Sequence, residues 1–296
     1  MPWQRLLTPV PDPVVPSDLR DWFAQLQAEI DSPPPFALAC LGGQRAATPG
    51  LAFLAGYQAA LRALWPQAPA GLGALCATEG RSLRPAELQT RYAEGRASGR
   101  KGFVTAAEAA DWLLVAAREE GEGEAPRLAM LRLSAAGPGV QLEPGPSLAL
   151  MPEVPHARLL LQDAPAERLP GDGWDDYVKP FRSLEDLYVH SALIAWLLAT
   201  AQRNGWPRAL QLRLLALLAS AAEVARQDPA AAITHLLLGG LFEQFAALRP
   251  ELEAALAAGP AQWQQLWLRD RGILELAGAA RAARLEKAWQ ALAAQA

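Results

Sequence analysis

The chain has 296 residues, enough for two domains or one domain of several parts with a real hydrophobic core. Hydrophobic residues make up 51% of the chain and the formal net charge is −4, which excludes a disordered protein and gives no overall positive field for nucleic acid. The two cysteines, Cys40 and Cys76, lack metal-ligand spacing, so we expect both to be buried in a reducing compartment and no metal site.

Neither a signal peptide nor a membrane span is predicted. The N-terminal segment lacks a basic region followed by an unbroken apolar one. The longest apolar stretches, such as residues 191–201, are too short to cross a bilayer. We therefore expect a cytoplasmic protein with no membrane and no nucleic acid as partner.

The N-terminal part predicts two helices. Residues 1–16 carry five prolines and predict an extended lead-in. Ser17 is a candidate cap for a helix through about Ile30, which the prolines of SPPP (32–35) end. Proline at a first-turn position predicts the second helix, from Pro49 through Leu64.

A block of strands follows, from about Leu72 to Pro165. The run GRKGFVT (99–105) is typical of a strand, and short segments with alternating apolar residues predict further strands at 111–118, 127–134, 139–144 and 156–164.

Helical spacing resumes near Ser183 and continues to the C-terminus. We expect helices from Ser183 to about Gln202, from Pro207 to about Arg226, from near Pro229 to before Pro250, and from Pro260 onward with a kink around Gly272 or Gly278. The sequence thus predicts an α+β fold of three domains. A helical segment (1–71) precedes a β-sandwich or barrel domain (72–182), and an antiparallel helical bundle (183–296) follows.

The segment CATEGRSLRP (76–85) resembles the T-E-P-x-x-G-S-D segment of the acyl-CoA dehydrogenase family of flavoproteins. Thr78 and Glu79 match its opening pair, and the resemblance makes Ser82 the hydroxyl near the flavin phosphates. The proline, the second glycine and the final aspartate of the pattern are absent. Taken alone, the segment is typical of a polar turn beside a strand.

Two further segments follow the order of the same family. GRKGFVT resembles its aromatic-valine-threonine run, which implies Phe103 against the flavin ring and Thr105 as a donor toward its N5 edge. The segment 154–174 resembles the end of the family's middle domain. The family's N-terminal domain is normally longer than the roughly 70 residues that precede the strands here. We therefore expect a truncated, divergent member.

The family places its catalytic glutamate at one of two positions. The late position reads Ala277-Gly278, whereas the early one, after the β domain, holds Glu185. The resemblance thus implies Glu185 as the base, with His190 as a less favoured alternative. A capping box that begins at Ser183 also accounts for the acids here. Arg203 resembles the arginine that reaches the flavin pyrophosphate of a neighbouring subunit, although a helix-terminal cation is the alternative.

The resemblance implies FAD as cofactor and α,β-dehydrogenation of an acyl-CoA thioester, in fatty acid metabolism. The alternative is a non-catalytic truncated relative that acts as a binding or assembly module. A homodimer or higher even oligomer is expected, because apolar residues near the start of the third C-terminal helix occupy more than one helical face. They are Leu236, Leu237, Leu238, Leu241, Phe242 and Phe245.

Overall fold

The computed structural model describes residues 3–8, 10–30, 33–80, 87–119, 127–145 and 147–294. Within these ranges four helices precede the sheet: α1 (Trp3–Leu7), α2 (Leu19–Ile30), α3 (Pro35–Arg45) and α4 (Pro49–Leu64). The bounds predicted for the helix at 49–64 are confirmed, with Thr48 as its cap accepting a hydrogen bond from the amide of Leu51. The cap of α2 is Asp18 rather than Ser17, since Asp18 accepts from the amides of Arg20 and Asp21.

Two N-terminal helices were not predicted. Residues 1–16 are not wholly extended, because α1 buries Leu6 completely and packs Trp3 against Phe36 at a ring distance of 6.2 Å. The prolines after α2 also begin α3, with Pro35 in its first turn. Proline has the φ that a first turn needs, so one run of prolines both ends a helix and starts the next.

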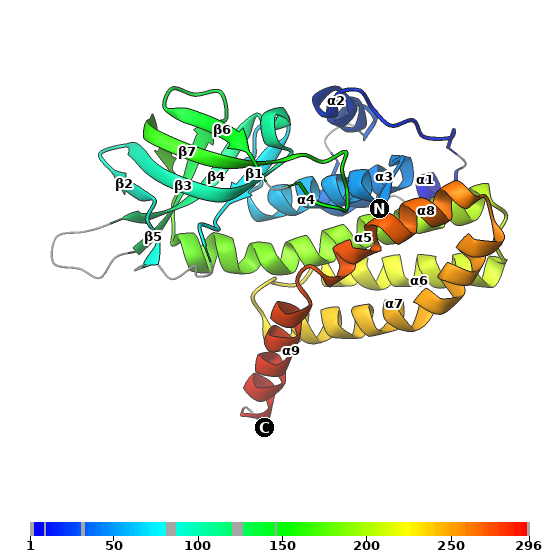
Figure 1. The fold of residues 1–296 in the computed structure, drawn as a ribbon. Coiled ribbons are helices and arrows are strands. Elements are labelled where there is room, and N and C mark those ends of the chain that lie inside the picture. The colour runs from blue at the N-terminus through cyan, green and yellow to red at the C-terminus, as the bar shows by residue number, and fades with distance from the viewer. Residues whose placement is uncertain are drawn as a thin grey trace.

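The eight strands of the described residues form one sheet, which curves into a half barrel (Figure 1). Its order is β6-β7-β3-β2-β4-β5-β8, and β1 pairs in parallel with β4. The strands predicted at 111–118, 127–134, 139–144 and 156–164 are confirmed as β4, β5, β6 and β7. The bounds are β1 (Gly73–Cys76), β2 (Arg91–Ala93), β3 (Arg96–Thr105), β4 (Trp112–Glu119), β5 (Arg127–Ser134), β6 (Val140–Pro144), β7 (His156–Pro165) and β8 (Glu167–Arg168).

The C-terminal helices follow a π-helical turn, η3 (Gly173–Val178). They are α5 (Lys179–Arg203), α6 (Arg208–Val224), α7 (Ala232–Ala258), α8 (Ala261–Asp270) and α9 (Gly278–Ala293), with a 3-10 turn, η4 (Arg271–Glu275), after α8. The break near Gly272 and Gly278 is confirmed. The predicted end before Pro250 is wrong, because α7 continues through this proline. Leu248, Leu252 and Leu256 are buried on both sides of it, and this packing compensates for the lost hydrogen bond.

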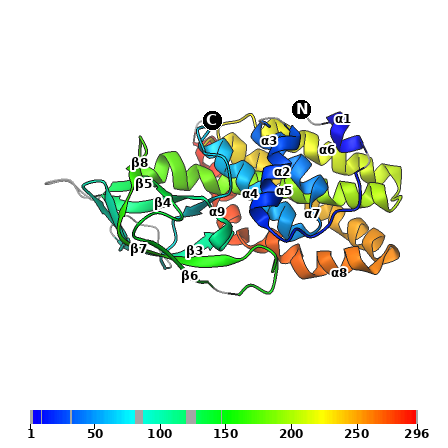
Figure 2. The same ribbon diagram turned by 90° about the horizontal axis from the view of Figure 1, so that it is seen from above.

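Helix α5 is the centre of the helical part (Figure 2). It packs against α3 and α4 on one side and α6 on the other, and 20 of its 25 residues are buried. Two glycines permit the close approach. A Cβ on Gly43 would lie 2.1 Å from the carbonyl oxygen of Ala192, and a Cβ on Gly56 would lie 2.6 Å from that of Tyr188. Backbone therefore meets backbone where α3 and α4 cross α5.

We expect Gly56→Ala to destabilise the protein by about 1–3 kcal/mol, because the added methyl must push α4 away from α5. Gly240 in α7 is the matched control, since a Cβ there meets no atom within 4 Å. Gly240→Ala should instead stabilise the helix by about 0.5–1 kcal/mol. Urea unfolding of both variants measures the difference. Equal stabilisation by the two alanines would contradict close packing at Gly56.

Candidate active site

Glu185 lines a cavity of about 170 Å³ between α4, α5 and the segment that joins α8 to α9. Phe53 of α4 and Val189 of α5 form apolar walls, together with Ile273 and Leu276. Ala277 lines the same cavity. The two positions at which the sequence analysis sought a glutamate therefore face one cavity, and only α5 supplies a carboxylate there.

Burial dominates the electrostatics of Glu185. Desolvation, followed by the charge of Asp186, raises the pKa of the Glu185 carboxyl to about 7, although Arg182 and Arg284 oppose the rise. This carboxylate makes no hydrogen bond or ion pair with any described residue. Glu185 thus has the pKa and the free lone pairs that a general base requires near neutral pH.

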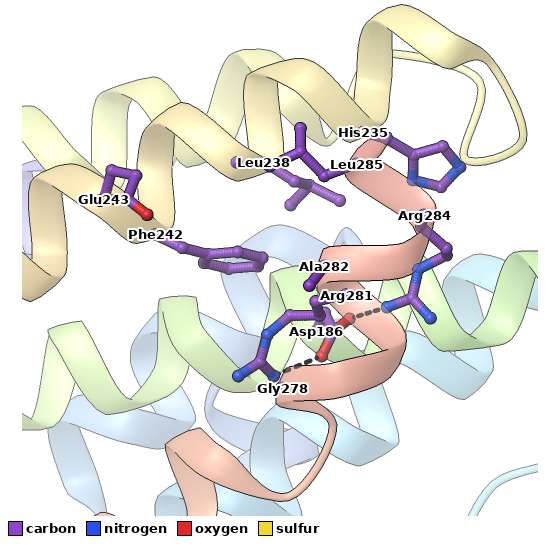
Figure 3. A pocket seen from close by; sticks show the side chains of 11 residues that line it. Asp186, His235, Leu238, Phe242, Glu243, Gly278, Arg281, Ala282, Arg284 and Leu285 are labelled. Carbon is purple, nitrogen blue, oxygen red and sulfur yellow. Dashed lines mark hydrogen bonds and ion pairs between the residues drawn. The ribbon is translucent and has the colours of Figure 1, made fainter. Parts of the chain in front are cut away.

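Asp186, the next residue on α5, has a structural role. Its carboxylate accepts a hydrogen bond from Arg281 at 3.0 Å and pairs with Arg284, both on α9 (Figure 3). The Arg281 guanidinium lies over the Phe242 ring at 5.3 Å and also donates to the carbonyl of Leu274. The predicted capping box is wrong, because Ser183 lies buried inside α5 and Asp186 anchors α9 instead.

His190 is held as a neutral side chain. It lies one turn after Asp186, and its Nδ1 is 2.7 Å from the Asp186 carbonyl oxygen. Its ring centroid is 4.3 Å from that of Phe242. Burial and the nearby Arg281 lower its pKa to about 3. His190 is therefore neutral near pH 7, with Nδ1–H donating to the Asp186 carbonyl, which disfavours it as a general acid.

Of the three residues expected to face a flavin ring, Thr78 and Phe103 lie close to each other and Thr105 lies elsewhere. The amide of Gly102 donates to the Thr78 carbonyl at 2.7 Å, which places Thr78 beside the bulge in β3 that carries Phe103. The Thr78 side chain is exposed, and Phe103 is 44% exposed with its ring edge-to-face against His156 at 6.2 Å. A Cβ on Gly102 would meet only the Thr78 carbonyl oxygen, at 3.5 Å. An open aromatic surface with an adjacent hydroxyl fits a planar flavin.

Thr105 points elsewhere, toward α4. Its hydroxyl lies near that of Tyr57, which accepts from the amide of Leu75 at 2.8 Å. Tyr57 stacks on Phe53 at 5.9 Å, and burial and the charge of Glu185 raise its pKa. Tyr57 was not predicted as a site residue. Its four-residue spacing from Phe53 on one helical face was the available signal.

Glu79, the second residue of the matched pair, fixes the loop to the sheet. Its carboxylate accepts from Lys101 Nζ at 2.6 Å and from the amides of Gln89 and Thr90 at 2.5 and 3.0 Å. The Lys101 side chain is completely buried. Burial alone would raise the Glu79 pKa, yet these donors lower it overall. Ser82 lies outside the described residues.

Arg203 is distant from Glu185 within one chain. It lies 18 residues further along α5, which corresponds to about 27 Å. There it donates to the carbonyl of Gln44 at 3.2 Å and lies over the Trp263 ring at 5.7 Å. A role at the candidate site of the same chain is therefore excluded. The predicted contact with the flavin of a neighbouring subunit stays a prediction.

A buried ionic cluster holds the segment after α8 against the sheet. Arg269 Nη2 contacts Glu153, in the β6–β7 loop, at 2.9 Å and Asp270 at 2.6 Å. Asp270 is fully buried and accepts from the amide of Met151 at 2.8 Å. Glu153 also accepts from Thr48, the cap of α4. This cluster fixes the start of η4, which carries the far wall of the Glu185 cavity.

Two classes of site find no support in the described part of the chain. None of its helices is long and apolar enough to cross a membrane. No group of three or more histidine, cysteine or acidic side chains among the described residues is placed to hold a metal ion.

The raised pKa of Glu185 predicts that the free energy of unfolding depends on pH. Its pKa is raised from 4.5 to about 7, so the folded chain keeps a proton that the unfolded chain releases between these values. The stability it contributes is present below about pH 4.5 and is lost as the pH rises toward 7. Between about pH 5 and about pH 8, we expect the free energy of unfolding of the wild type to fall by about 1–2 kcal/mol more than that of Glu185→Gln. This difference is smaller than the full pKa shift implies, because solvent screens a carboxylate that is partly exposed. Urea unfolding at both pH values measures this, and parallel losses would contradict the raised pKa.

No protein-family model and no curated protein matches the sequence. Solved structures do match, all at low identity. FkbI, for biosynthesis of the methoxymalonyl extender unit of a polyketide immunosuppressant, matches with a TM-score of 0.63 and 19% identity over 93% of this chain and 94% of FkbI. Butyryl-CoA dehydrogenase from Megasphaera elsdenii matches with a TM-score of 0.63 and 15% identity over 87% of this chain and 80% of that one. The FAD complex of PigA matches with a TM-score of 0.51 and 16% identity over 75% and 72%. The chain therefore has the acyl-CoA dehydrogenase-like fold that its sequence predicted.

Proposed function

We propose that this protein is a flavin-dependent oxidoreductase that dehydrogenates an acyl thioester, with Glu185 as the general base. The observation that carries the proposal is the Glu185 carboxylate, which lines an apolar cavity with a pKa near 7 and without a hydrogen-bond partner among the described residues. A base of this kind suits removal of the weakly acidic proton next to a thioester carbonyl.

The chain's own groups would divide the work as follows. Phe53, Val189 and Ile273 would exclude water around the substrate. The Glu185 carboxylate would accept the α-proton and hold it at its oxygen. Ala277 supplies no carboxylate on the opposite wall, and the second acid that lines the cavity, Asp186, is paired with Arg281 and Arg284.

The cofactor that we propose is FAD, with Phe103 against its ring and Thr78 beside it. FAD, when bound, supplies the acceptor for the hydride that leaves the β-carbon. Phe103 of β3 and Thr78 beside it are both exposed, and Tyr57 stacks on Phe53, which lines the Glu185 cavity. Ser82 and Arg203 stay candidates for the phosphates, the latter from a neighbouring subunit. The proposed substrate class, an acyl-CoA, is the one in the name of the butyryl-CoA dehydrogenase with this fold.

The alternative function is a binding or assembly module without catalysis. One observation favours it: the Thr105 hydroxyl, expected to face the flavin, lies near that of Tyr57 instead. A module of this kind would keep the fold without binding flavin.

The Glu185→Gln variant tests the proposed base. It keeps the shape of the side chain and removes its basicity, so FAD binding should survive. Reduction of bound flavin by an acyl-CoA should slow by about two to four orders of magnitude. Anaerobic stopped-flow absorbance of the flavin measures this rate.

Glu275→Gln is the matched control. Glu275 is exposed on η4, close in sequence to Ala277, and pairs with Arg249 at 3.1 Å. Its variant should reduce flavin at the wild-type rate. Undiminished reduction in Glu185→Gln, or equal loss in both variants, would remove Glu185 from the reaction.

We also propose a homodimer or higher even oligomer. Of the apolar residues that motivated this prediction, Leu238, Leu241 and Phe245 are buried within the chain itself. Ile233 and Leu237 stay exposed on α7. We expect light scattering at micromolar concentration to report at least a dimer. A monomer under those conditions would contradict the proposal.

A further inference from the structure

A second cavity, of about 460 Å³, lies between η3, the start of α5, the start of α7 and α9. Four basic side chains line it: Lys179 and Arg182 from α5, and Arg284 and Lys287 from α9. His235 of α7 is a fifth nitrogen-bearing group in its wall. None of the described residues that line it is acidic. We call this cavity the cationic pocket.

Nearby carboxylates neutralise only part of this charge. Lys179 pairs with Asp175 at 3.3 Å on the exposed surface, and Arg284 pairs with Asp186. Arg182 and Lys287 make no hydrogen bond or ion pair with the described residues. The cationic pocket thus keeps an excess of about two positive charges.

The pKa values of two side chains in the wall of the cationic pocket are lowered. Burial, followed by the charges of Arg284 and Lys179, lowers the pKa of His235. Burial and Arg284 likewise lower the pKa of Arg182, whose guanidinium lies over the Trp174 ring at 5.0 Å. Burial is the larger cause of both shifts, and the neighbouring positive charges add to it.

A third cavity lies between the cationic pocket and the Glu185 cavity. This cavity, of about 220 Å³, shares His235 and Arg284 with the cationic pocket and shares Asp186 and Arg281 with the Glu185 cavity (Figure 3). The three cavities therefore adjoin one another along α5 and α9. The ion pairs of Asp186 with Arg281 and Arg284 lie in the walls that these cavities share.

We propose that the cationic pocket binds a phosphate group of a ligand. Two arginines and two lysines around one cavity suit a group with several anionic oxygens, since guanidinium forks and ammonium groups both form charge-assisted hydrogen bonds to phosphate. The ligand is either a free phosphate compound or the carrier of the acyl thioester. The second source rests on the proposed function, whereas the phosphate site itself does not.

Calorimetric titration of the full chain at fixed ionic strength tests the site without any turnover. The probes are coenzyme A, inorganic pyrophosphate, and pantetheine, which has the thiol arm but no phosphate. We expect coenzyme A and pyrophosphate to bind and pantetheine not to bind. Coenzyme A that binds more tightly than pyrophosphate identifies the carrier as the source, and equal affinities identify a free phosphate compound. Binding of neither phosphate compound overturns the proposal.

Charge-removing variants locate the site. Lys287 is exposed, so Lys287→Gln keeps the fold, and it should weaken the phosphate probes about tenfold, the scale of one lost charge-assisted contact. Arg182→Gln should weaken them by a similar factor. Arg213→Gln is the control, because Arg213 is exposed on α6 and pairs with Glu251 at 2.6 Å. Equal weakening by the Arg213 and Lys287 variants would contradict a site in the cationic pocket. A chain that binds these probes but reduces no flavin would contradict the proposed function alone.

Discussion

The close packing of α5 against α3 and α4 is the constraint on which the rest of the structure depends. Gly43 and Gly56 bring the helix backbones into contact, and no residue with a side chain fits there without displacement. This packing determines the rotation of α5 about its axis and its position along that axis, and so where its side chains lie. Glu185 therefore lines the cavity next to Phe53, and Asp186 pairs with α9. Lys179 and Arg182, in the first turn of α5, line the cationic pocket. One buried helix positions both the proposed base and the proposed phosphate site.

Ion pairs then close the site with segments that are distant in sequence. Asp186 holds α9 through Arg281 and Arg284, and the cluster of Arg269 and Glu153 holds η4 against the β6–β7 loop. The carboxylates in both places are mostly or fully buried, so removing one partner would leave a charge without compensation. Apolar residues alone would bury these segments without fixing their register. The ion pairs determine which side chains of the α8–α9 segment face Glu185.

Local sequence signals predicted much of the fold. Pro49 marks the first turn of α4, and short segments of alternating apolar residues predict four strands to within one or two residues. Errors arose where tertiary packing overrode such signals, as at Pro250 and at Ser183. For the site, Glu185 was predicted and lines a cavity. The surroundings of Glu185 were not predictable from the sequence. Tyr57 near Thr105, and Asp186 with Arg281 of α9, are pairs of residues far apart in the chain that only folding brings together.

The central claim is that this fold holds a flavin on the β3 surface beside the Glu185 cavity. The most direct test is titration of the purified full chain with FAD, followed by the absorption spectrum of the protein after removal of free FAD. We expect flavin to stay with the wild-type chain, with a shifted spectrum, and to be held more weakly by Phe103→Ala. A chain that retains no flavin after incubation with excess FAD would contradict the account.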